Sequence, residues 1–438
     1  MIAHARRPEH DGGVAWEAAP ALPEADVDVD AARLWSESGC QAVTHPDAAV
    51  PARLVATLAG IVDGLDGRGA GVDERFGGRG LGALAERAAT LLFPRSGRSS
   101  CGGASRLLAT ADGWVAATLA RPADRELLPA WLGIDPGAAC VVSNAEPWSE
   151  VARRVAERES AEVVECASAL GLACAGVGEV VARPGVLRLP LGDAAPRDLA
   201  GLRVVNLASL WAGPLAALVL ARLGADVVCV ESTGRPDGAR ATPRWFDAMH
   251  TGQRSVALDF RREDDVATLA ALLAVADVVI EGSRPRALEQ LGISGTELVR
   301  RGPRVWVSIT GYGRDPASAM RVALGDDAAA AGGLVGWAEG GPVFLADAVA
   351  DPLTGLVCAH AIVDAVTIGG RWLVDVALAR VASAVAPRDG DPVVPALSDE
   401  SPGRAAPRGA PPFELGMHTA QVLDDWLGQR GVDTNLNI

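Results

Sequence analysis

The stretch that decides the fold covers residues 199–231 and reads LAGLRVVNLASLWAGPLAALVLARLGADVVCVE. Residues 202–207 form a short apolar run rich in valine, which is typical of a buried strand. The apolar residues 215–223 have the length of a helix, and a second strand-like run follows at residues 226–230. Strand, helix and strand in this order predict a βαβ unit with two parallel strands.

The alternation of strands and helices continues to residue 386. Its further predicted strands lie at residues 255–258, 278–280, 305–309 and 372–376. This rhythm predicts an α/β fold with a Rossmann-like, doubly wound parallel sheet over residues 198–386. The composition agrees, because 49% of the residues are hydrophobic but only 4% are aromatic, which favours layers of small side chains.

The region before the sheet predicts a second unit, for which a chain of 438 residues has room. Residues 95–191 are predicted to form a smaller α+β domain, because Asp112-Gly113 is a strong turn signal between two strand-like runs. Helices are predicted in it at residues 125–132 and 148–170. A linker with Pro and Gly, residues 189–196, is predicted to close this domain.

The outer segments carry weaker patterns. Residues 31–94 have leucines at helical spacing and predict a helical segment. It could be a vestigial repeat of residues 332–366, with Val50 in the place of Asp351, or a chance similarity. The remaining segments are predicted as a flexible arm at residues 1–30, a Pro/Gly-rich linker at residues 387–412 and a C-terminal helical tail at residues 413–438.

The charged residues exclude several kinds of chemistry. All 40 basic residues are arginine. A Schiff-base lysine, a pyridoxal phosphate anchor, a Walker A lysine and a biotin or lipoyl attachment site are therefore excluded. A net charge of −15 argues against nucleic acid as a partner, because binding a phosphate backbone requires a concentrated basic field.

The cysteines and the apolar runs predict the environment of the protein. Seven cysteines without C-x-x-C spacing or paired histidines indicate neither a metal site nor a disulfide framework. The first residues, MIAHARRPEHDGG, lack the apolar core of a signal peptide, and no run approaches the roughly 18 uncharged apolar residues of a membrane span. We therefore expect a soluble, cytoplasmic protein with no metal and no membrane partner.

The turn after the first strand is a candidate binding site. A helix that starts at Ala212-Gly213 offers free N–H groups to phosphate or carboxylate, and Glu231 at the end of the next strand can read a ribose. A nicotinamide cofactor is the weaker hypothesis, because the G-x-G-x-x-G fingerprint is absent. Alternatively, Gly213-Pro214 only turns the chain and starts the helix.

Several more motifs follow in a characteristic order. They are GQRSVALD at residues 252–259, ADVVIE at 276–281, SRP at 283–285, SITGYG at 308–313, ADPLTG at 350–355 and GRWLVDV at 370–376. Together with residues 199–231 they resemble the class III CoA-transferases, the formyl-CoA and carnitine-CoA transferase family. Residues 95–185 resemble its small domain. In a usual member that domain follows the first part of the sheet, so the order here is predicted to be permuted or fused.

The resemblance implies that Asp351 is a covalent nucleophile. In relatives the aspartate at this place attacks an acyl-CoA thioester, giving a mixed anhydride and then an aspartyl-CoA thioester, from which a carboxylic acid leaves as the new acyl-CoA. We expect the helix N-terminus to keep this carboxylate ionised at neutral pH. Asp347 competes for the role but lacks the Thr-Gly context. The residues alone favour an ordinary helix start at Asp351-Pro352, and only the resemblance favours the catalytic role.

The resemblance also implies the substrates, an acyl-CoA and a carboxylic acid, with coenzyme A bound as acyl-CoA and no tightly bound cofactor. CoA would lie over the carboxyl ends of the strands. Its predicted contacts are the backbone of Trp211, Ala212 and Gly213 and the side chains of Arg254, Ser283 and Arg284, with Arg235 and Arg240 as looser phosphate partners. Arginine forks suit phosphate oxygens, although each could be a solvated surface charge.

The glycines Gly102 and Gly103 match the place of the family's lid loop, which closes over the reactive anhydride and excludes water. An ordinary connecting loop is the alternative. The resemblance further implies an interlocked homodimer.

Three other functions stay open. Racemases of 2-methylacyl-CoA in the family use a His at the position of Asp326, so this chain lacks their second acid/base group. A non-catalytic homologue or scaffold subunit is the second alternative. A dinucleotide-dependent oxidoreductase on the same sheet is the third.

Overall fold

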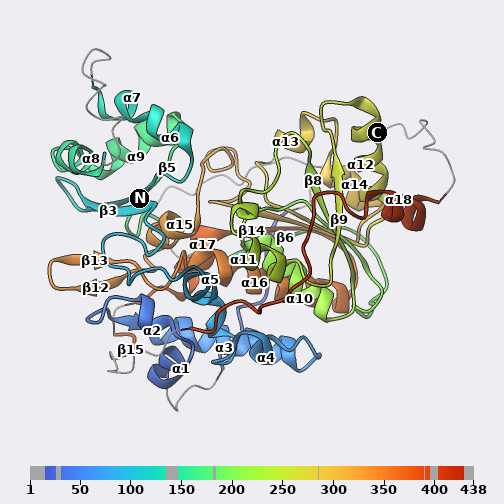
Figure 1. Ribbon diagram of the computed structural model, residues 1–438, viewed down its shortest axis with the longest axis horizontal. Helices are drawn as coiled ribbons and strands as arrows, with labels where there is room; N and C mark the ends of the chain where they lie inside the picture. Colours follow the sequence, from blue (N-terminus) through green and yellow to red (C-terminus); the bar gives the residue numbers. More distant parts are fainter. Residues whose placement is uncertain are drawn as a thin grey trace.

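The centre of the fold is an eight-stranded sheet with the order β1-β6-β14-β11-β10-β7-β8-β9. Figure 1 shows β14, β6, β8 and β9 of this sheet. The computed structural model describes residues 15–25, 31–134, 147–180, 184–284, 286–388, 390–394 and 403–428. Six neighbouring strands are parallel: β14 (Arg371–Ala377), β11 (Val305–Thr310), β10 (Val278–Glu281), β7 (Arg203–Asn206), β8 (Asp226–Ser232) and β9 (Arg254–Leu258). The six predicted strands and a mixed α/β fold with a large, mainly parallel sheet are confirmed.

Two further strands correct the sequence analysis. β6 (Val186–Gly192) runs antiparallel to β14, and β1 (Glu17–Ala18) runs antiparallel to β6. Residues 189–192 are therefore strand and not linker, and the predicted arm contributes a strand to the sheet. The proline in β6 misled the prediction. Because β1 pairs only with Leu187 and Arg188, Pro190 lies where β6 is the sheet edge, and a missing N–H is tolerated there.

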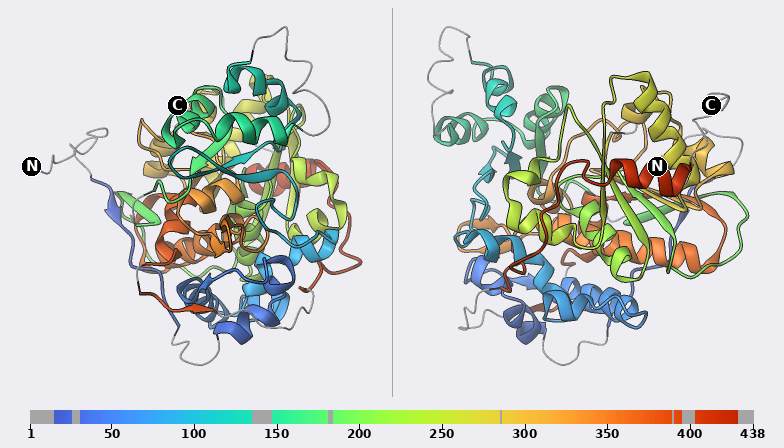
Figure 2. Two further views of the ribbon diagram at one scale, coloured as in Figure 1. Left: turned by 90° about the vertical axis from the view of Figure 1, so that its left-hand side faces the viewer. Right: turned by 45° about the vertical axis from the view of Figure 1, so that its right-hand side comes forward.

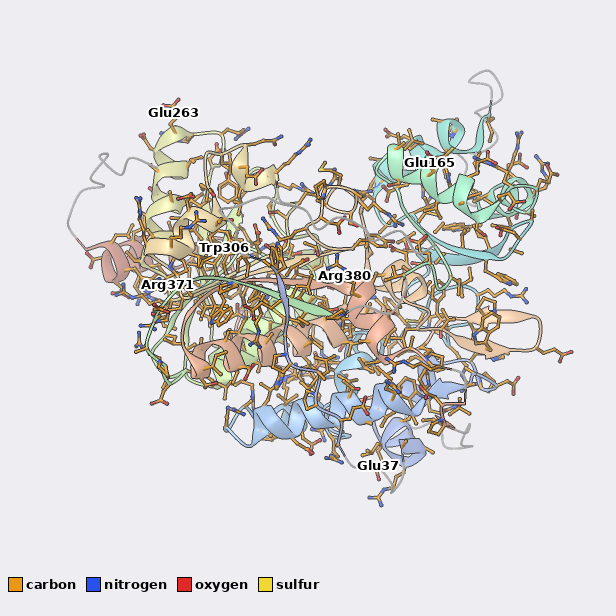
Figure 3. All side chains as sticks on the ribbon, turned by 180° about the vertical axis from the view of Figure 1, so that it is seen from behind. Glu37, Glu165, Glu263, Trp306, Arg371 and Arg380 are labelled. Atoms are coloured by element: carbon orange, nitrogen blue, oxygen red, sulfur yellow. The ribbon has the colours of Figure 1, made fainter. Side chains whose placement is uncertain are left out.

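Helices cover both faces of the sheet (Figure 1). Alternate strand residues point to opposite faces. Val204 and Val227 therefore share a core with α10 (Ala212–Arg222) and α16 (Ala350–Ile368). The intervening strand residues face the helices that cover the other side: α12 (Glu263–Val275), α14 (Gly295–Arg301) and α18 (Thr419–Leu427). Trp306 of β11 belongs to this second core (Figure 3).

The helix α16 lies in the middle of the first core. It packs against α10, α17 (Leu378–Val385) and α3 (Ala52–Asp66). Among the described residues it is the one helix long and apolar enough to cross a membrane by length and composition, but 72% of its most apolar window is buried inside the protein. Its apolar composition is therefore explained by its position as a core helix of this fold.

A second, smaller sheet holds β3 (Ser105–Ala109), β4 (Trp114–Thr118) and β5 (Ala173–Gly176), all antiparallel. The predicted strand pair around Asp112-Gly113 is confirmed. Each of the two predicted helices is split into two shorter ones: α6 (Pro122–Glu126) and α7 (Leu128–Leu132), and α8 (Trp148–Val155) and α9 (Ser160–Ala169). The last three of these helices pack with β3, β4 and β5 around a core that includes Trp131.

The predicted helical segment forms a layer beneath α16 (Figure 1). Its elements are α1 (Ala31–Glu37), α2 (Cys40–Val43), the short strand β2 (Val50–Pro51), α3, α4 (Val72–Phe76), the 3-10 turn η1 (Leu81–Leu84) and α5 (Glu86–Leu91). β2 pairs with β15 (Val393–Val394), so the predicted linker 387–412 also contains a strand. The vestigial-repeat hypothesis stays a prediction.

A strap of residues 403–418 then crosses the molecule to α18 (Figure 2). Its backbone N–H groups at Ala406, Phe413 and Gly416 donate to Thr90, Asp247 and Ser255. The strap passes α11 (Pro243–Met249) and ends where α18 packs beside β9; the helix predicted in the C-terminal tail is α18. It thereby ties the N-terminal helices to the sheet.

The remaining elements connect these layers. They are η3 (Gly238–Ala241), α13 (Arg286–Glu289), α15 (Gly325–Ala331) and the hairpin of β12 (Gly336–Ala338) and β13 (Gly341–Val343). Behind the sheet, Arg380 of α17 pairs with Asp315 and Asp375 (Figure 3).

Candidate active site

Asp351 is the second residue of α16 and lines a cavity of about 280 Å³. The cavity lies where three regions meet: the N-terminal helices, the small sheet, and the ends of α10, α15 and α16 next to the main sheet. Its polar lining residues are Arg87, Ser100, Ser105, Thr118, Thr242, Asp326 and Asp351. Its larger apolar lining residues are Leu91, Phe93, Leu210, Trp211, Trp245 and Leu324.

The loop before α16 has an unusual backbone. Ala346 and Ala348 both have positive φ angles, 48° and 45°, which cost about 1–2 kcal/mol each for a residue with a side chain. They flank Asp347, whose N–H donates to Leu84 at 3.2 Å. The strained loop places Asp347 and Asp351 in different surroundings.

Asp347 is bound to Arg87. The Arg87 Nε donates to Asp347 Oδ2 at 2.8 Å and Nη2 donates to Oδ1, while the Asp347 side chain is 1% exposed. The guanidinium lies 4.6 Å from the centre of the Trp211 ring, in cation–π geometry. Asp347 is therefore the counter-ion of Arg87, and Asp351 is the carboxyl of the two that lines the cavity.

The Asp351 carboxyl is not held ionised, which corrects the expectation from the helix start. Burial, together with the neighbouring Asp326 and Asp347, raises the pKa of Asp351 to about 7, against the opposing effects of Arg87 and a hydrogen bond from the Gly325 N–H. Desolvation and like charges thus outweigh the helix terminus. At neutral pH the group is about half ionised.

Asp326, at the start of α15, is a second titratable group in the cavity wall. Ser105 Oγ donates to Asp326 Oδ2 at 2.8 Å, and burial raises the pKa of Asp326 to about 6. Its neighbour Asp327 accepts from Thr118 Oγ1 at 3.0 Å, and burial raises the pKa of Asp327 to about 8. These hydrogen bonds join the small sheet to α15.

Gly325 allows this close approach. A Cβ at this position would lie 2.4 Å from the carbonyl oxygen of Ala348 and 2.7 Å from Asp351 Oδ2, well inside contact distance. A glycine is therefore required for α15 to meet the start of α16 here.

The predicted turn after β7 is also brought to the cavity. Trp211 lines it, and the Trp245 ring meets Trp211 edge-on with centroids 5.2 Å apart. Ala212 and Gly213 form the first turn of α10, where a Cβ on Gly213 would lie 2.2 Å from the Ala208 Cβ. Gly213 thus lets the start of α10 pack closely against Ala208 at the carboxyl end of β7.

Arg254 does not lie at the cavity, which corrects its prediction as a CoA contact. It is the first residue of β9, at the end of the sheet opposite to the carboxyl ends of the strands. Its guanidinium donates to Asp226 at 2.6 Å and 3.1 Å and to Asp425 at 2.6 Å. The looser candidate Arg240 is likewise engaged, because it pairs with the buried Glu231 and donates to the Phe413 carbonyl.

The other predicted CoA contacts lie on the carboxyl side of the sheet but outside the lining of the cavity. Ser283 and Arg284 follow β10, where Ser283 Oγ donates to Glu281 at 3.4 Å and Arg284 is exposed. Arg235 is exposed in the loop after β8. Their contact with CoA stays a prediction.

The predicted lid loop does lie at the cavity. Gly102 lines it, and Gly103 beside it has φ 78°. The loop is held by the Ser105 N–H, which donates to Ser100 Oγ at 3.1 Å, and by the Gly103 N–H, which donates to the Ser100 carbonyl at 2.9 Å. The structure brings the loop and Asp351 together, while closure stays a prediction.

Sequence reasoning missed Arg87, Ser105, Thr118 and Trp245 as site residues. Arg87 is 260 positions from its partner Asp347, and Ser105 is 221 positions from Asp326, so no local pattern links them. Within the described residues, no group of three or more His, Cys, Asp or Glu side chains is arranged to hold a metal ion.

Comparison with known proteins gives a partial match. Residues 199–390 match the model of CoA-transferase family III, which confirms the resemblance seen in the motifs of this region. A succinate–glutarate CoA-transferase of Agrobacterium fabrum is 32% identical over 211 residues, 43% of this chain and 52% of the relative. A formyl-CoA:oxalate CoA-transferase of Rhodopseudomonas palustris is 30% identical over 180 residues, 39% and 42% of the two chains.

A solved structure gives a similar partial match. A CAIB/BAIF family protein from Brucella suis is 32% identical, with 43% of this chain and 55% of that chain covered and a TM-score of 0.39. The chain spans about half the length of the curated relatives it matches.

Proposed function

Since residues 199–390 match CoA-transferase family III, we propose that this protein moves CoA between an acyl-CoA and a free carboxylic acid, with Asp351 as the covalent nucleophile. One observation carries the proposal. Asp347 precedes α16 and is bound to Arg87, whereas Asp351 lies at the start of α16 and lines the cavity.

The proposed reaction has four steps. An Asp351 oxygen attacks the thioester carbonyl, giving a mixed anhydride and the CoA thiolate. The thiolate attacks the Asp351 carbonyl carbon, giving an aspartyl-CoA thioester and releasing the donor carboxylate. The acceptor carboxylate then attacks this thioester, giving a second anhydride and the thiolate. The thiolate finally attacks the acceptor's acyl carbon, which releases the new acyl-CoA and the Asp351 carboxylate.

The surrounding residues support these steps. The Gly325 N–H donates to the Asp351 carboxyl and would orient it toward a thioester. The N–H groups of Ala212 and Gly213, in the first turn of α10, would stabilise negative charge on phosphate or on a developing oxyanion. The Gly102 loop and the aromatic wall would limit water, which hydrolyses an anhydride.

The experiment is an exchange assay. The protein is incubated with a panel of acyl-CoAs and free acids, and the acyl-CoAs formed are followed by mass spectrometry, for wild type and Asp351→Asn. We expect exchange in wild type and a loss of at least about a thousandfold in the variant. Exchange that survives the substitution would rule out Asp351, and no exchange with any pair would favour the scaffold alternative.

Asp326 favours a second candidate function, because its carboxyl can take the place of the acid/base histidine that this chain lacks. Because it lines the same cavity as Asp351 and the pKa of its carboxyl is about 6, the two acids could remove and return a proton at C2 of an acyl-CoA, as an epimerase requires. Incubation of 2-methylacyl-CoA in D₂O tests this. Deuterium at C2 with inversion of configuration would support epimerisation, and an unlabelled substrate would exclude it.

A further inference from the structure

The cavity has an excess of acidic groups. Among the described residues that line it, Arg87, Asp326 and Asp351 are the charged ones. The positive charge of Arg87 is matched by Asp347, which lies behind it and is 1% exposed. Two carboxyls therefore remain in the wall without a cation of their own.

The rest of the wall is largely apolar. Phe93, Trp211, Trp245 and Leu324 supply most of its large side chains, and Trp245 is buried beneath the cavity surface. Such a wall binds an apolar group by removing its surface from water. A second carboxylate, at the far end of an acyl chain placed in this space, would lose its hydration and lie near Asp326, and near Asp351 whenever that group is not acylated.

On the basis of the proposed function, we infer that the acyl group handled by this site is uncharged and apolar, so that the acids are monocarboxylic and dicarboxylates such as succinate are disfavoured. The rival occupant is a dicarboxylate whose far carboxylate binds the Arg87 guanidinium. It is opposed by Asp347, which already accepts two hydrogen bonds from Arg87.

A matched pair of acceptor acids tests the inference. In 4-methylpentanoate an isopropyl group replaces the far carboxylate of succinate, so that the two acids have nearly the same shape. Each is offered with one donor, butyryl-CoA, and kcat/KM is measured by the new acyl-CoA formed. We expect 4-methylpentanoate to exceed succinate by at least about tenfold. Equal rates, or a preference for succinate, would overturn the inference.

Two variants separate charge from shape. Asp326→Asn removes one acid of the wall and should lower the ratio of the two kcat/KM values by at least about threefold. Asp425→Asn makes the same change of charge at the far end of the sheet, where Asp425 pairs with Arg254, and should leave the ratio unchanged. A ratio that moves equally in both variants, or in neither, contradicts the role of the wall charge.

The proposed function and the inference fail in different ways. If no acid is converted, binding of succinyl-CoA and 4-methylpentanoyl-CoA to the wild-type protein is compared by calorimetry. Weaker binding of succinyl-CoA upholds the inference although transfer is absent, and equal or tighter binding of succinyl-CoA overturns it.

Discussion

At Asp351 the competing effects can be compared in size. A helix N-terminus favours a carboxylate by about 0.3–1 kcal/mol. Raising the pKa from 3.8 to about 7 corresponds to about 4 kcal/mol against the ionised form. Burial and the two neighbouring acids therefore decide the state of this group, and the helix start that marked it in the sequence does not.

The raised pKa of Asp351 predicts how the activity depends on pH. Because only the ionised Asp351 can attack a thioester, kcat/KM should rise with pH through a midpoint near 7. Since Asp326 raises the pKa of Asp351, Asp326→Asn should move the midpoint down by about one pH unit. Initial rates between pH 5.5 and 8.5 measure both. A flat wild-type profile would show that another group limits the reaction.

The stability of the protein should also depend on whether Asp351 is ionised. The folded state binds the Asp351 proton more tightly than the unfolded chain does. Below about pH 4 the group is protonated in both states and does not change the free energy of unfolding. As the pH rises from about 4 to about 7, the group lowers the free energy of unfolding. Asp351→Asn should therefore stabilise the protein by up to about 4 kcal/mol at pH 8 and by little near pH 4. Urea unfolding at the two pH values measures this, with Asp425→Asn as the control. Equal gains at both values would contradict the raised pKa.

At the scale of elements, the contact between α16 and α10 positions the nucleophile. Gly355, one turn after Asp351, faces α10, where a Cβ would lie 2.8 Å from the Ala212 carbonyl oxygen and 3.0 Å from the Leu215 Cβ. The glycine in the Thr-Gly part of the motif therefore has a structural role. The glycine lets the two helices that border the cavity pack closely.

Gly355→Ala tests that contact. We expect a loss of about 1–3 kcal/mol in unfolding free energy, because the helices must separate, together with lower activity. Gly64→Ala in α3 is the matched control, since its Cβ would meet nothing closer than 3.9 Å and alanine favours a helix by about 0.5–1 kcal/mol. A Gly355→Ala protein as stable as Gly64→Ala would show that the contact has no effect.

The elements also show what local sequence can predict. The buried parallel strands were predicted because each has a short, mostly apolar core rich in valine, as in residues 227–230. β6 was missed because its proline and glycine indicate a loop unless the partner strand is known. β1 is two residues long, and its pairing depends entirely on β6.

At the scale of the whole molecule, the site depends on contacts between distant segments. Asp351, Trp211 and the Gly102 loop were found from motifs, because each belongs to a recognisable local pattern. Arg87 comes from a helix whose sequence indicates nothing but packing, and only the tertiary fold brings it to Asp347. The same holds for Arg254, whose position at the wrong end of β9 depends on where Asp226 and Asp425 lie.

Transfer of an oxygen atom to Asp351 tests the covalent proposal most directly. The protein turns over an acyl-CoA with an acceptor acid that carries ¹⁸O in its carboxylate, in ordinary water, and the peptide with Asp351 is sequenced by mass spectrometry. If Asp351 forms the anhydride with the acceptor, one ¹⁸O remains in its carboxyl after each transfer. We expect the label in Asp351 and in neither Asp347 nor Asp326. Turnover without label in the protein, or with label in another residue, would contradict Asp351 as the nucleophile.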